Sequence, residues 1–374
     1  MPTALLAGAF GQRSPDDEAV LEAFLAALPE WQIIVTSSEP SLTAATHGCR
    51  AVPARDLRAL RRALLEADAI VLAGGTVFRT LHGRAGRSMH DLLTWALLLA
   101  AGGQATGKPV AMLGIGADPL PDARARRLAR ALVRCADLLV LRDEESAHAL
   151  SAAGAPTPFR VGADPAWTLV DESPTAAQDG ERVLVALGHP AEAGNLADRL
   201  AAALGPLVTS GLKVELQPWQ DSHGATRGGG MASALAARLG GRVQVAAPPA
   251  NPGDAKVCMT GARLVVCLCS FAMMVAAAAG TPFVAIAHEH KHVGLARRLQ
   301  QPAVPISADP ATITDKILGG LGGQAAASPA AVRAEIARAA EGFRLLRLLL
   351  TGGAASELDT FGGLSLVPAP WTAK

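Results

Sequence analysis

The feature that most constrains the fold of this chain is a regular alternation between short, continuous apolar runs and segments with apolar residues at helical spacing. Continuous apolar runs are typical of strands that are covered on both faces, and the helical segments between them supply the cover. This rhythm predicts an α/β fold of parallel sheets enclosed by helices. In the first half of the chain the predicted strands are Ala4 to Ala7, Ile33 to Thr36, Ala69 to Ala73, Val110 to Gly114 and Leu138 to Leu141.

The same alternation restarts after a polar, unpatterned segment that we interpret as a linker. The second series of predicted strands is Val183 to Leu187, Lys213 to Gln217, Val243 to Val245, Leu264 to Leu268, Phe283 to Ala287 and Ala303 to Ile306. We therefore predict an N-terminal Rossmann-like domain at 1–172, a linker at 173–180, a C-terminal Rossmann-like domain at 181–328, a closing helix at 329–350 and a loose tail at 351–374. Two such domains facing each other would bind a ligand between them, at the carboxyl ends of their strands.

The composition excludes several classes of protein. The 374 residues include 34 Lys and Arg against 33 Asp and Glu, so the chain is neither an acidic disordered segment nor a basic nucleic-acid binder. Its five cysteines are an odd number and show no C-x-x-C spacing, which favours a reducing compartment over a disulfide framework. The first ten residues lack the basic start of a signal peptide, so we expect a cytoplasmic protein.

One uncharged stretch, Leu264 to Ala287, is long enough on paper to cross a bilayer. Gly280 and Pro282 divide it, however, so we predict a strand, a helix and a second strand instead. Contact with a membrane is at most peripheral, through Arg344 and Arg347 of the closing helix; the alternative is that the apolar residues of this helix pack onto the first domain. The sequence leaves the oligomeric state open.

Three glycine-rich segments directly follow predicted strands: Gly8 to Gly11, Gly74-Gly75-Thr76 and Gly114-Ile115-Gly116. Turns of this kind let the backbone approach a ligand, and the helix that follows can hold an anion at its first amides. Neither a complete G-x-G-x-x-G fingerprint nor a P-loop motif is present. The sequence therefore predicts a phosphate or carboxylate ligand, without a nucleotide cofactor or any other.

An arginine stands at the end of the last predicted strand of the first half. Asp143, Glu144 and Glu145 follow it, and the dipole of the next helix explains these three acids. The dipole does not explain Arg142. A guanidinium at a strand's carboxyl end can contact a carboxylate or phosphate through two hydrogen bonds, so we predict that Arg142 binds an anionic ligand.

Six blocks of sequence, taken in order, resemble a known family. They are Gly8-Ala9-Phe10-Gly11 through Asp17-Glu18-Ala19, Ala73 to Thr80, Gly114 to Pro119, Ala136 to Ser146, Asp164-Pro165-Ala166, and Ala276 to Ile286 followed by Glu289-His290-Lys291. Together they resemble the polysaccharide pyruvyl transferase family, and within it the cell-wall, CsaB-like type, over roughly residues 4 to 345. The blocks Arg142 to Ser146 and Ala276 to Ile286 are the most specific.

The resemblance implies a glycosyltransferase-B-like pair of Rossmann-like domains with phosphoenolpyruvate as donor. Its enolpyruvyl unit would pass to two hydroxyl groups of a cell-wall or capsular saccharide, free or lipid-linked, and form a ketal. Such a reaction needs cations for the donor and an acid and a base for proton transfer. The residues implied are Arg142 and Lys291 for the donor's anionic groups, Gly74, Gly75, Gly114 and Gly116 for backbone amides, and Asp17 and Glu18 for the acceptor.

The chain departs from the family pattern where the family has an Arg-Leu-His triplet. These positions are Cys269-Ser270-Phe271 here, so Cys269 stands for the arginine and Phe271 for the histidine, and we count both among the predicted substrate-binding residues. A thiol cannot replace a guanidinium as an anion clamp, and a phenyl ring cannot transfer a proton. The first glycine turn also differs, with Ser14 for asparagine and Asp16 for glycine, and Arg79-Thr80 replaces glutamine and aspartate in the second.

Three interpretations are open for His288, His290 and His292, which alternate just beyond a predicted strand. If the strand extends, the three imidazoles would share one face near Lys291; with Glu289 they would then supply the missing acid and base, or would hold a transition metal. The third interpretation is a polar surface loop. We take His288, His290 and Glu289 as the catalytic candidates, predict no metal, and regard Cys269 as a core residue rather than a thiolate nucleophile.

The sequence thus favours a pyruvyl transferase that acts on a saccharide. The replaced triplet keeps a second interpretation open, in which an inactive member of the family binds a saccharide or a protein partner. A nucleotide-sugar glycosyltransferase is the third, because one fold serves many functions.

Overall fold

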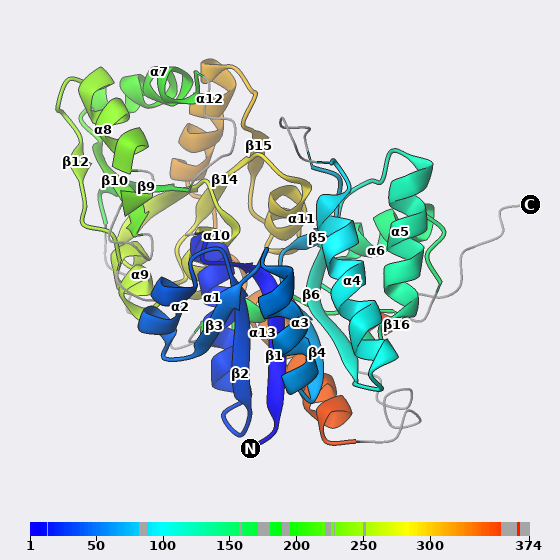
Figure 1. Ribbon diagram of the computed structural model, residues 1–374. Helices are drawn as coiled ribbons and strands as arrows, with labels where there is room; N and C mark the ends of the chain where they lie inside the picture. Colours follow the sequence, from blue (N-terminus) through cyan, green and yellow to red (C-terminus); the bar gives the residue numbers. More distant parts are fainter. Residues whose placement is uncertain are drawn as a thin grey trace, which may run out of the picture. The chain divides into compact units, whose positions relative to one another are not determined.

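The computed structural model describes residues 1–12, 14–81, 88–156, 159–170, 180–188, 195–220, 226–227, 229–249, 252–352 and 365–366. The chain forms two compact units, drawn together in Figure 1. Unit 1 comprises Met1–Gln12, Val20–Thr168 and Glu335–Lys374, and unit 2 comprises Arg13–Ala19 and Leu169–Ala334. Each unit therefore includes a segment from the opposite end of the sequence.

Within the described part of unit 1, nine strands form one sheet in the order β16-β8-β7-β6-β4-β1-β2-β3, with β5 paired to β6. All pairs are parallel except β16 with β8. The strands are β1 (Thr3–Phe10), β2 (Gln32–Ser37), β3 (Arg50–Pro53), β4 (Ala69–Ala73), β5 (Thr76–Phe78), β6 (Val110–Ala117), β7 (Leu138–Leu141), β8 (Arg160–Val161) and β16 (Ser365–Leu366).

The helices of unit 1 follow the strands in βαβ order. They are α1 (Pro15–Ala27, whose first turn belongs to unit 2), α2 (Pro40–His47), α3 (Leu57–Glu66), α4 (Asp91–Ala105), α5 (Ala123–Arg134), α6 (Glu144–Ala152) and the 3-10 helix η1 (Pro165–Leu169). Every residue of β4 is buried, as expected for a central parallel strand. Leu72 on β4 and Met112 on β6 belong to one apolar core with Leu93 and Leu99 of α4 and Leu132 of α5.

Unit 2 repeats this architecture with seven described strands, in the order β11-β10-β9-β13-β14-β15 and with β12 paired to β10. Only the pair β10 and β11 is antiparallel. The strands are β9 (Arg182–Leu187), β10 (Lys213–Gln220), β11 (Thr226–Arg227), β12 (Gln244–Val245), β13 (Ala262–Cys267), β14 (Phe283–Ala287) and β15 (Ala303–Pro305). The helices are α7 (Leu196–Thr209), α8 (Gly229–Arg238), α9 (Pro252–Met259), α10 (Ser270–Ala278), α11 (His290–Arg298), α12 (Pro310–Leu321) and α13 (Pro329–Leu350).

The predicted strands of both series are present, and the stretch Leu264 to Ala287 is divided into β13, α10 and β14 as expected. All nine residues of α10 are buried in the protein. Among the described residues, every helix is either too short or too polar to cross a membrane. The predicted linker at 173–180 lies outside the described residues except for Gly180, and so does the tail at 351–374 except for residues 351–352 and β16.

The closing helix α13 continues from unit 2 into unit 1. Its Phe343 is buried in unit 1 and meets the ring of Phe24 edge to face, with 4.9 Å between centroids. Leu346 and Leu350 are buried as well, and Arg344 is paired with Glu341. The apolar residues of this helix thus pack in the core of unit 1, which was the alternative to membrane contact.

Candidate functional site

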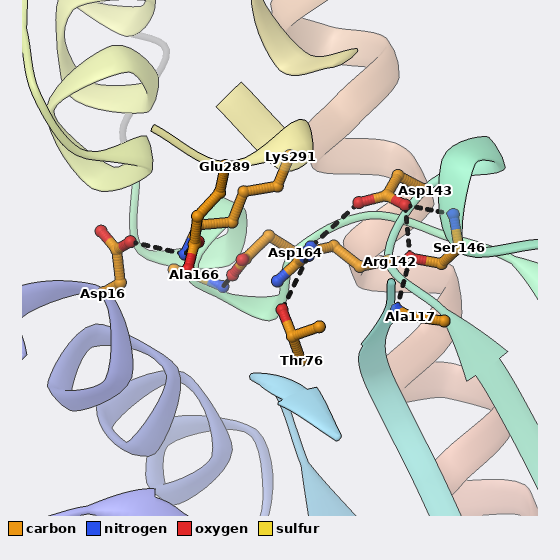
Figure 2. Close-up of polar contacts among 10 residues, drawn as sticks. All are labelled: Asp16, Thr76, Ala117, Arg142, Asp143, Ser146, Asp164, Ala166, Glu289 and Lys291. Atoms are coloured by element: carbon orange, nitrogen blue, oxygen red, sulfur yellow. Dashed lines mark hydrogen bonds and ion pairs between the residues drawn. The ribbon is translucent and has the colours of Figure 1, made fainter. Parts of the chain in front are cut away.

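The first group of polar side chains lies in unit 1, where β7 ends and α6 begins. Arg142 directly follows β7, and its side chain is buried. Its Nε donates a hydrogen bond to Oδ2 of Asp143 at 3.0 Å, and its Nη2 lies 3.5 Å from Oγ1 of Thr76 on β5 (Figure 2). We call Arg142, Asp143, Ser146 and Thr76 the arginine network. It holds the predicted anion-binding guanidinium in one orientation.

Asp143 also caps helix α6. Its Oδ1 accepts hydrogen bonds from the backbone N–H of Ser146, at 2.8 Å, and from the Ser146 hydroxyl. That hydroxyl in turn accepts the amide of Ala117 at the end of β6, at 2.9 Å. Burial alone would raise the pKa of Asp143, but Arg142 and Ser146 outweigh burial and hold this pKa below its usual value. The carboxylate is therefore ionised and balances the charge of Arg142.

Of two predicted glycine turns, the structure has one and not the other. Gly74 and Gly75 directly follow β4, as predicted. Gly114 and Gly116, in contrast, lie inside β6, so the turn predicted at this place is wrong. The strand is longer than predicted because β5 pairs alongside its last residues. Gly114 and Gly116 are therefore part of a continuing strand and do not form a turn.

The backbone amides of Gly74 and Gly116 donate hydrogen bonds to carbonyls of neighbouring residues. Gly74 donates to the carbonyl of Leu113 at 2.9 Å, and Gly116 donates to the carbonyl of Gly75 at 2.7 Å. Gly116 also makes room for the arginine network, because the guanidinium of Arg142 occupies the place where a Cβ at residue 116 would lie. This glycine therefore allows close approach of an arginine to the strand.

The second group of polar side chains lies in unit 2, around Lys291 on α11. Asp16, on the first turn of α1, accepts the backbone N–H of Phe271 through Oδ1 at 2.9 Å. Its Oδ2 lies 3.2 Å from Nζ of Lys291, which is also 3.0 Å from Oε2 of Glu289 (Figure 2). We call Asp16, Lys291 and Glu289 the lysine network. It pairs one ammonium with two carboxylates.

Burial alone would raise the pKa values of both carboxyls in the lysine network. Lys291 and the N–H of Phe271 outweigh burial at Asp16 and lower its pKa. At Glu289, Lys291 and the neighbouring histidines lower the pKa to about 2. Both carboxylates are therefore ionised at neutral pH, and the network carries a net charge of one negative unit.

Asp17 is the next residue on α1, and its pKa is raised, whereas that of Asp16 is lowered. Burial is the largest effect on this half-buried carboxyl, and with the like charge of Asp16 it raises the pKa of Asp17 to about 7, against the attraction of Lys291. Such a carboxyl exists in both protonation states at neutral pH. Glu18, the other residue predicted to face the acceptor, follows on the same helix and is also half-buried.

The positions that replace the family's arginine and histidine are buried. Cys269 immediately precedes α10 and Phe271 is the second residue of that helix; they are 7% and 4% exposed. Burial, together with the negative charge of Asp16, raises the pKa of the Cys269 thiol far above its usual value. Cys269 is therefore a thiol in the core, as predicted, and not a thiolate nucleophile.

The three alternating histidines do not share a face. They would do so only if the strand extended through them, and this condition is not met, because β14 ends at Ala287 as predicted and α11 begins at His290. The turn between strand and helix brings the rings of His288 and His292 together, with 4.3 Å between centroids. His290 is instead exposed, whereas His292 is buried. A two-residue period holds only while the chain is extended.

Burial, followed by the charge of Lys291 and by His288, lowers the pKa of His292 to about 3, and burial also lowers the pKa of His288. Both imidazoles are neutral at pH 7 and are poor proton donors. Together with Glu289 they form the one group of three or more His, Cys, Asp or Glu side chains among the described residues whose geometry would suit a metal ion.

The predicted site residues thus form two groups, one in each unit. Unit 1 brings Arg142 together with Gly116 and Thr76, and unit 2 brings Lys291, Glu289 and Phe271 together around Asp16. From the sequence, Asp16 stood out only as a departure from the family's glycine and had no predicted role. Ser146, which joins Asp143 to the amide of Ala117, was given no role either.

The model of the family described as polysaccharide pyruvyl transferase matches residues 18–290 of the chain. No curated protein sequence matches it. Among solved structures, a UDP-GlcNAc 2-epimerase from Methanocaldococcus jannaschii is similar, with a TM-score of 0.61 and 12% identity. The match covers 94% of this chain and 100% of that chain.

Two further solved structures have the same coverage of 94% of this chain and 100% of their own. One is a UDP-GlcNAc 2-epimerase from Neisseria meningitidis bound to UDP-GlcNAc, with a TM-score of 0.59 and 11% identity. The other is the Anabaena protein HepE in complex with UDP-glucose, with a TM-score of 0.59 and 13% identity. At such low identity these likenesses establish the fold alone. The chain has the glycosyltransferase-B-like fold, with two Rossmann-like units and a C-terminal helix.

Proposed function

The chain belongs to the polysaccharide pyruvyl transferase family, and from this premise we propose that it transfers pyruvate from phosphoenolpyruvate to a saccharide as a ketal. In that reaction the donor's methylene carbon gains a proton, two saccharide hydroxyls bond to the neighbouring carbon, and the bond to phosphate breaks. Of the two hydroxyl protons, one balances the new methyl group and the other leaves on phosphate. The protein must therefore bind two anionic groups and move protons.

The observation that carries the proposal is the arginine network of unit 1. Arg142 lies at the carboxyl end of a parallel strand, which is where α/β sheets bind their ligands. Asp143 and Thr76 hold the guanidinium in place, so little conformational freedom would be lost when it binds the carboxylate or phosphate of the donor. A preorganised arginine of this kind suits phosphoenolpyruvate.

For proton transfer we propose Asp17 in place of the histidine that the family would supply. A general acid or base is most effective when its pKa lies near the working pH, and burial brings the pKa of Asp17 to about 7. The lowered pKa values of His288 and His292 make both imidazoles weaker candidates. Glu18, on the same helix, is proposed to orient the acceptor saccharide, as the family pattern suggests.

The lysine network favours a second candidate function, an inactive family member that binds a saccharide. Asp16 stands where the family pattern has glycine, and its carboxylate accepts the helix amide of Phe271 and pairs with Lys291. An anion of the protein itself thus occupies groups that would suit the anion of a donor. In this alternative, the pair of Rossmann-like units is kept for recognition without chemistry.

Titration calorimetry with phosphoenolpyruvate, followed by assays of phosphate release with cell-wall saccharides, separates the two candidates. For the transferase we expect micromolar donor binding by the unmodified chain. Arg142→Lys keeps the charge but loses the planar fork, so binding should weaken at least about tenfold. Asp17→Asn should still bind the donor and lose turnover by about 10²- to 10⁴-fold. Glu22→Gln, an exposed change on the same helix, is the matched control.

The opposite result is equally clear. If folded protein gives no heat with millimolar phosphoenolpyruvate but binds a saccharide, the transferase proposal fails and the binding module stands. UDP-glucose and UDP-GlcNAc, tested in the same calorimeter, show whether a nucleotide sugar is the ligand instead. Circular dichroism of each variant confirms that a loss of binding is not a loss of folding.

A further inference from the structure

His288, Glu289 and His292 lie at the junction between β14 and α11, entirely within unit 2. One potential ligand atom from each of the three side chains lies within 4.8 Å of the others. Two imidazoles and a carboxylate are the donor set that many zinc sites use when a fourth position is left for water or substrate. The strand-to-helix turn creates this grouping, because it brings the rings of His288 and His292 to 4.3 Å between centroids.

The burial of the two imidazoles is the second observation. His292 is only 1% exposed, and in the described part of the chain its Nε2 has no hydrogen-bond partner. Nδ1 of His288 is likewise buried and has no such partner among those residues. Buried polar nitrogens almost always have one, so two orphaned ring nitrogens in the same small cluster call for a ligand. A surface loop, the third interpretation left open by the sequence, would leave both nitrogens in water.

Charge favours a cation at this place. Lys291 is next to the cluster and would repel a metal ion by itself, but it is paired with both Asp16 and Glu289. Two carboxylates against one ammonium leave a net negative charge beside two neutral imidazoles. The contact of Lys291 is with Oε2 of Glu289, and a carboxylate has two oxygens that can accept in several directions. Glu289 can therefore serve the lysine and a metal together.

We propose that His288, Glu289 and His292 form a binding site for a divalent transition metal, with zinc as the best match. Nitrogen and oxygen ligands bind zinc at about 2.0–2.2 Å, so tetrahedral ligand atoms lie about 3.4 Å from one another. The three ligand atoms now lie within 4.8 Å of one another, so zinc would draw them closer together. The fourth position would be open to water or to an oxygen atom of a ligand. This proposal does not rest on the proposed transferase function.

Coordination also specifies a tautomer. Nδ1 of His292 now faces the backbone N–H of His288 across 3.4 Å, the outer limit of a hydrogen bond. A metal bound to Nε2 moves the ring proton to Nδ1, so this long contact would be given up for a metal–nitrogen bond. The site therefore exchanges one weak interaction for a strong one, and it needs no acceptor for the buried Nε2.

The test uses the full-length, tag-free chain, stripped with a chelator and titrated with zinc chloride by calorimetry. One equivalent of zinc should bind with micromolar affinity or better, and it should raise the melting temperature, because only the folded chain presents the site. His288→Ala and Glu289→Gln should each weaken zinc binding at least about tenfold, the lower end of what loss of even an outer-shell partner costs. His290→Ala, an exposed histidine of the same segment, should bind zinc like the unmodified chain.

Several results would overturn the proposal. Absence of stoichiometric zinc binding by the folded chain is one, and equal weakening in all three variants is another. Binding that survives both His288→Ala and Glu289→Gln would assign the metal to other groups, such as cysteine thiols. Cobalt(II) titration decides this last point, because thiolate ligands give charge-transfer bands that histidine and carboxylate ligands do not. Should His288→Ala fail to fold, Glu289→Gln, which preserves volume, decides alone.

Discussion

Helices α6 and α10 are capped by the same chemistry from very different places in the sequence. In unit 1, Asp143 accepts the N–H of Ser146, three residues away, and pairs with Arg142 beside it. In unit 2, Asp16 accepts the N–H of Phe271, which is 255 residues away, and pairs with Lys291. Cys269, the residue in the capping position of α10, makes no side-chain capping bond. Long-range packing can therefore supply a cap that the local sequence lacks.

The two arrangements differ in how the charges are shared. Arg142 and Asp143 form one buried pair, whereas Lys291 faces Asp16 and Glu289, with Asp17 nearby. Burial disfavours every one of these carboxylates. At Asp17 alone burial, with the charge of Asp16, outweighs the attraction of Lys291, so only the pKa of Asp17 rises. Asp17 therefore titrates near neutral pH, whereas the other three carboxyls are ionised there.

The largest effect is expected where the local cap is broken. Asp143→Ala removes the helix cap and leaves the Arg142 guanidinium buried without its partner, which should cost about 3–5 kcal/mol of unfolding free energy. Urea denaturation followed by circular dichroism measures the loss. Glu144→Ala, an exposed acid in the first turn of the same helix, should cost less than about 1 kcal/mol. Equal losses in the two variants would show that the pair contributes nothing beyond the helix dipole.

A pH-dependent effect is expected at Asp17. Its pKa is raised in the folded chain, so its contribution to stability is complete below the unfolded value of about 3.9 and is lost as the pH rises through about 7. Asp17→Asn removes this penalty and should raise stability over the unmodified chain by about 1–3 kcal/mol more at pH 8 than at pH 5.

Melting curves across this pH range, with Glu22→Gln as the exposed control, measure the effect of Asp17→Asn. A stability difference between Asp17→Asn and the unmodified chain that does not change with pH would mean that Asp17 is ionised throughout and cannot act as the proposed acid and base.

A smaller loss of unfolding free energy is expected when Asp16, which caps α10 from a distant part of the sequence, is replaced. Asp16→Ala removes the partner of the Phe271 amide and one partner of Lys291, and should cost about 1–2 kcal/mol. Asp16→Asn keeps an oxygen acceptor for the amide and should recover about half of that loss. Chemical denaturation of both variants tests this order. If Asp16→Asn is as damaging as Asp16→Ala, the ion pair matters and the cap does not.

The smallest change in unfolding free energy is expected at Cys269, which occupies the capping position of α10 without making a side-chain capping bond. Cys269→Ser places a hydroxyl where a cap residue is preferred, and this gain opposes the cost of burying a polar group. We expect the unfolding free energy to change by less than about 1 kcal/mol, and turnover to stay within about twofold. A collapse of turnover in a variant that folds and melts normally would mean that the thiol takes part in chemistry.

Much of the fold was predictable because its signals are local. The continuous apolar run Phe283 to Ala287 marks β14 to the residue, and the closing helix α13 has its predicted bounds, 329–350. The start of α6 was also predictable, from the three acids that follow the strand. Prediction failed at Gly114 and Gly116, because pairing with β5 extends β6 beyond the point where glycine usually ends a strand. The sequence left the arrangement of the histidines open, because their alternation does not show that a helix begins at His290.

The sequence by itself determined the α/β class, the strands, the family and the positions where the chain departs from it. Only the tertiary structure decided that residues 13–19 belong to unit 2, and that Asp16 serves both Phe271 and Lys291. It also decided that the pKa of Asp17 is raised to about 7 and that the rings of His288 and His292 lie together while His290 faces solvent. The reason is physical: periodicity and capping depend on neighbours along the chain, whereas a pKa or a ligand cluster depends on desolvation and on charges that folding brings near.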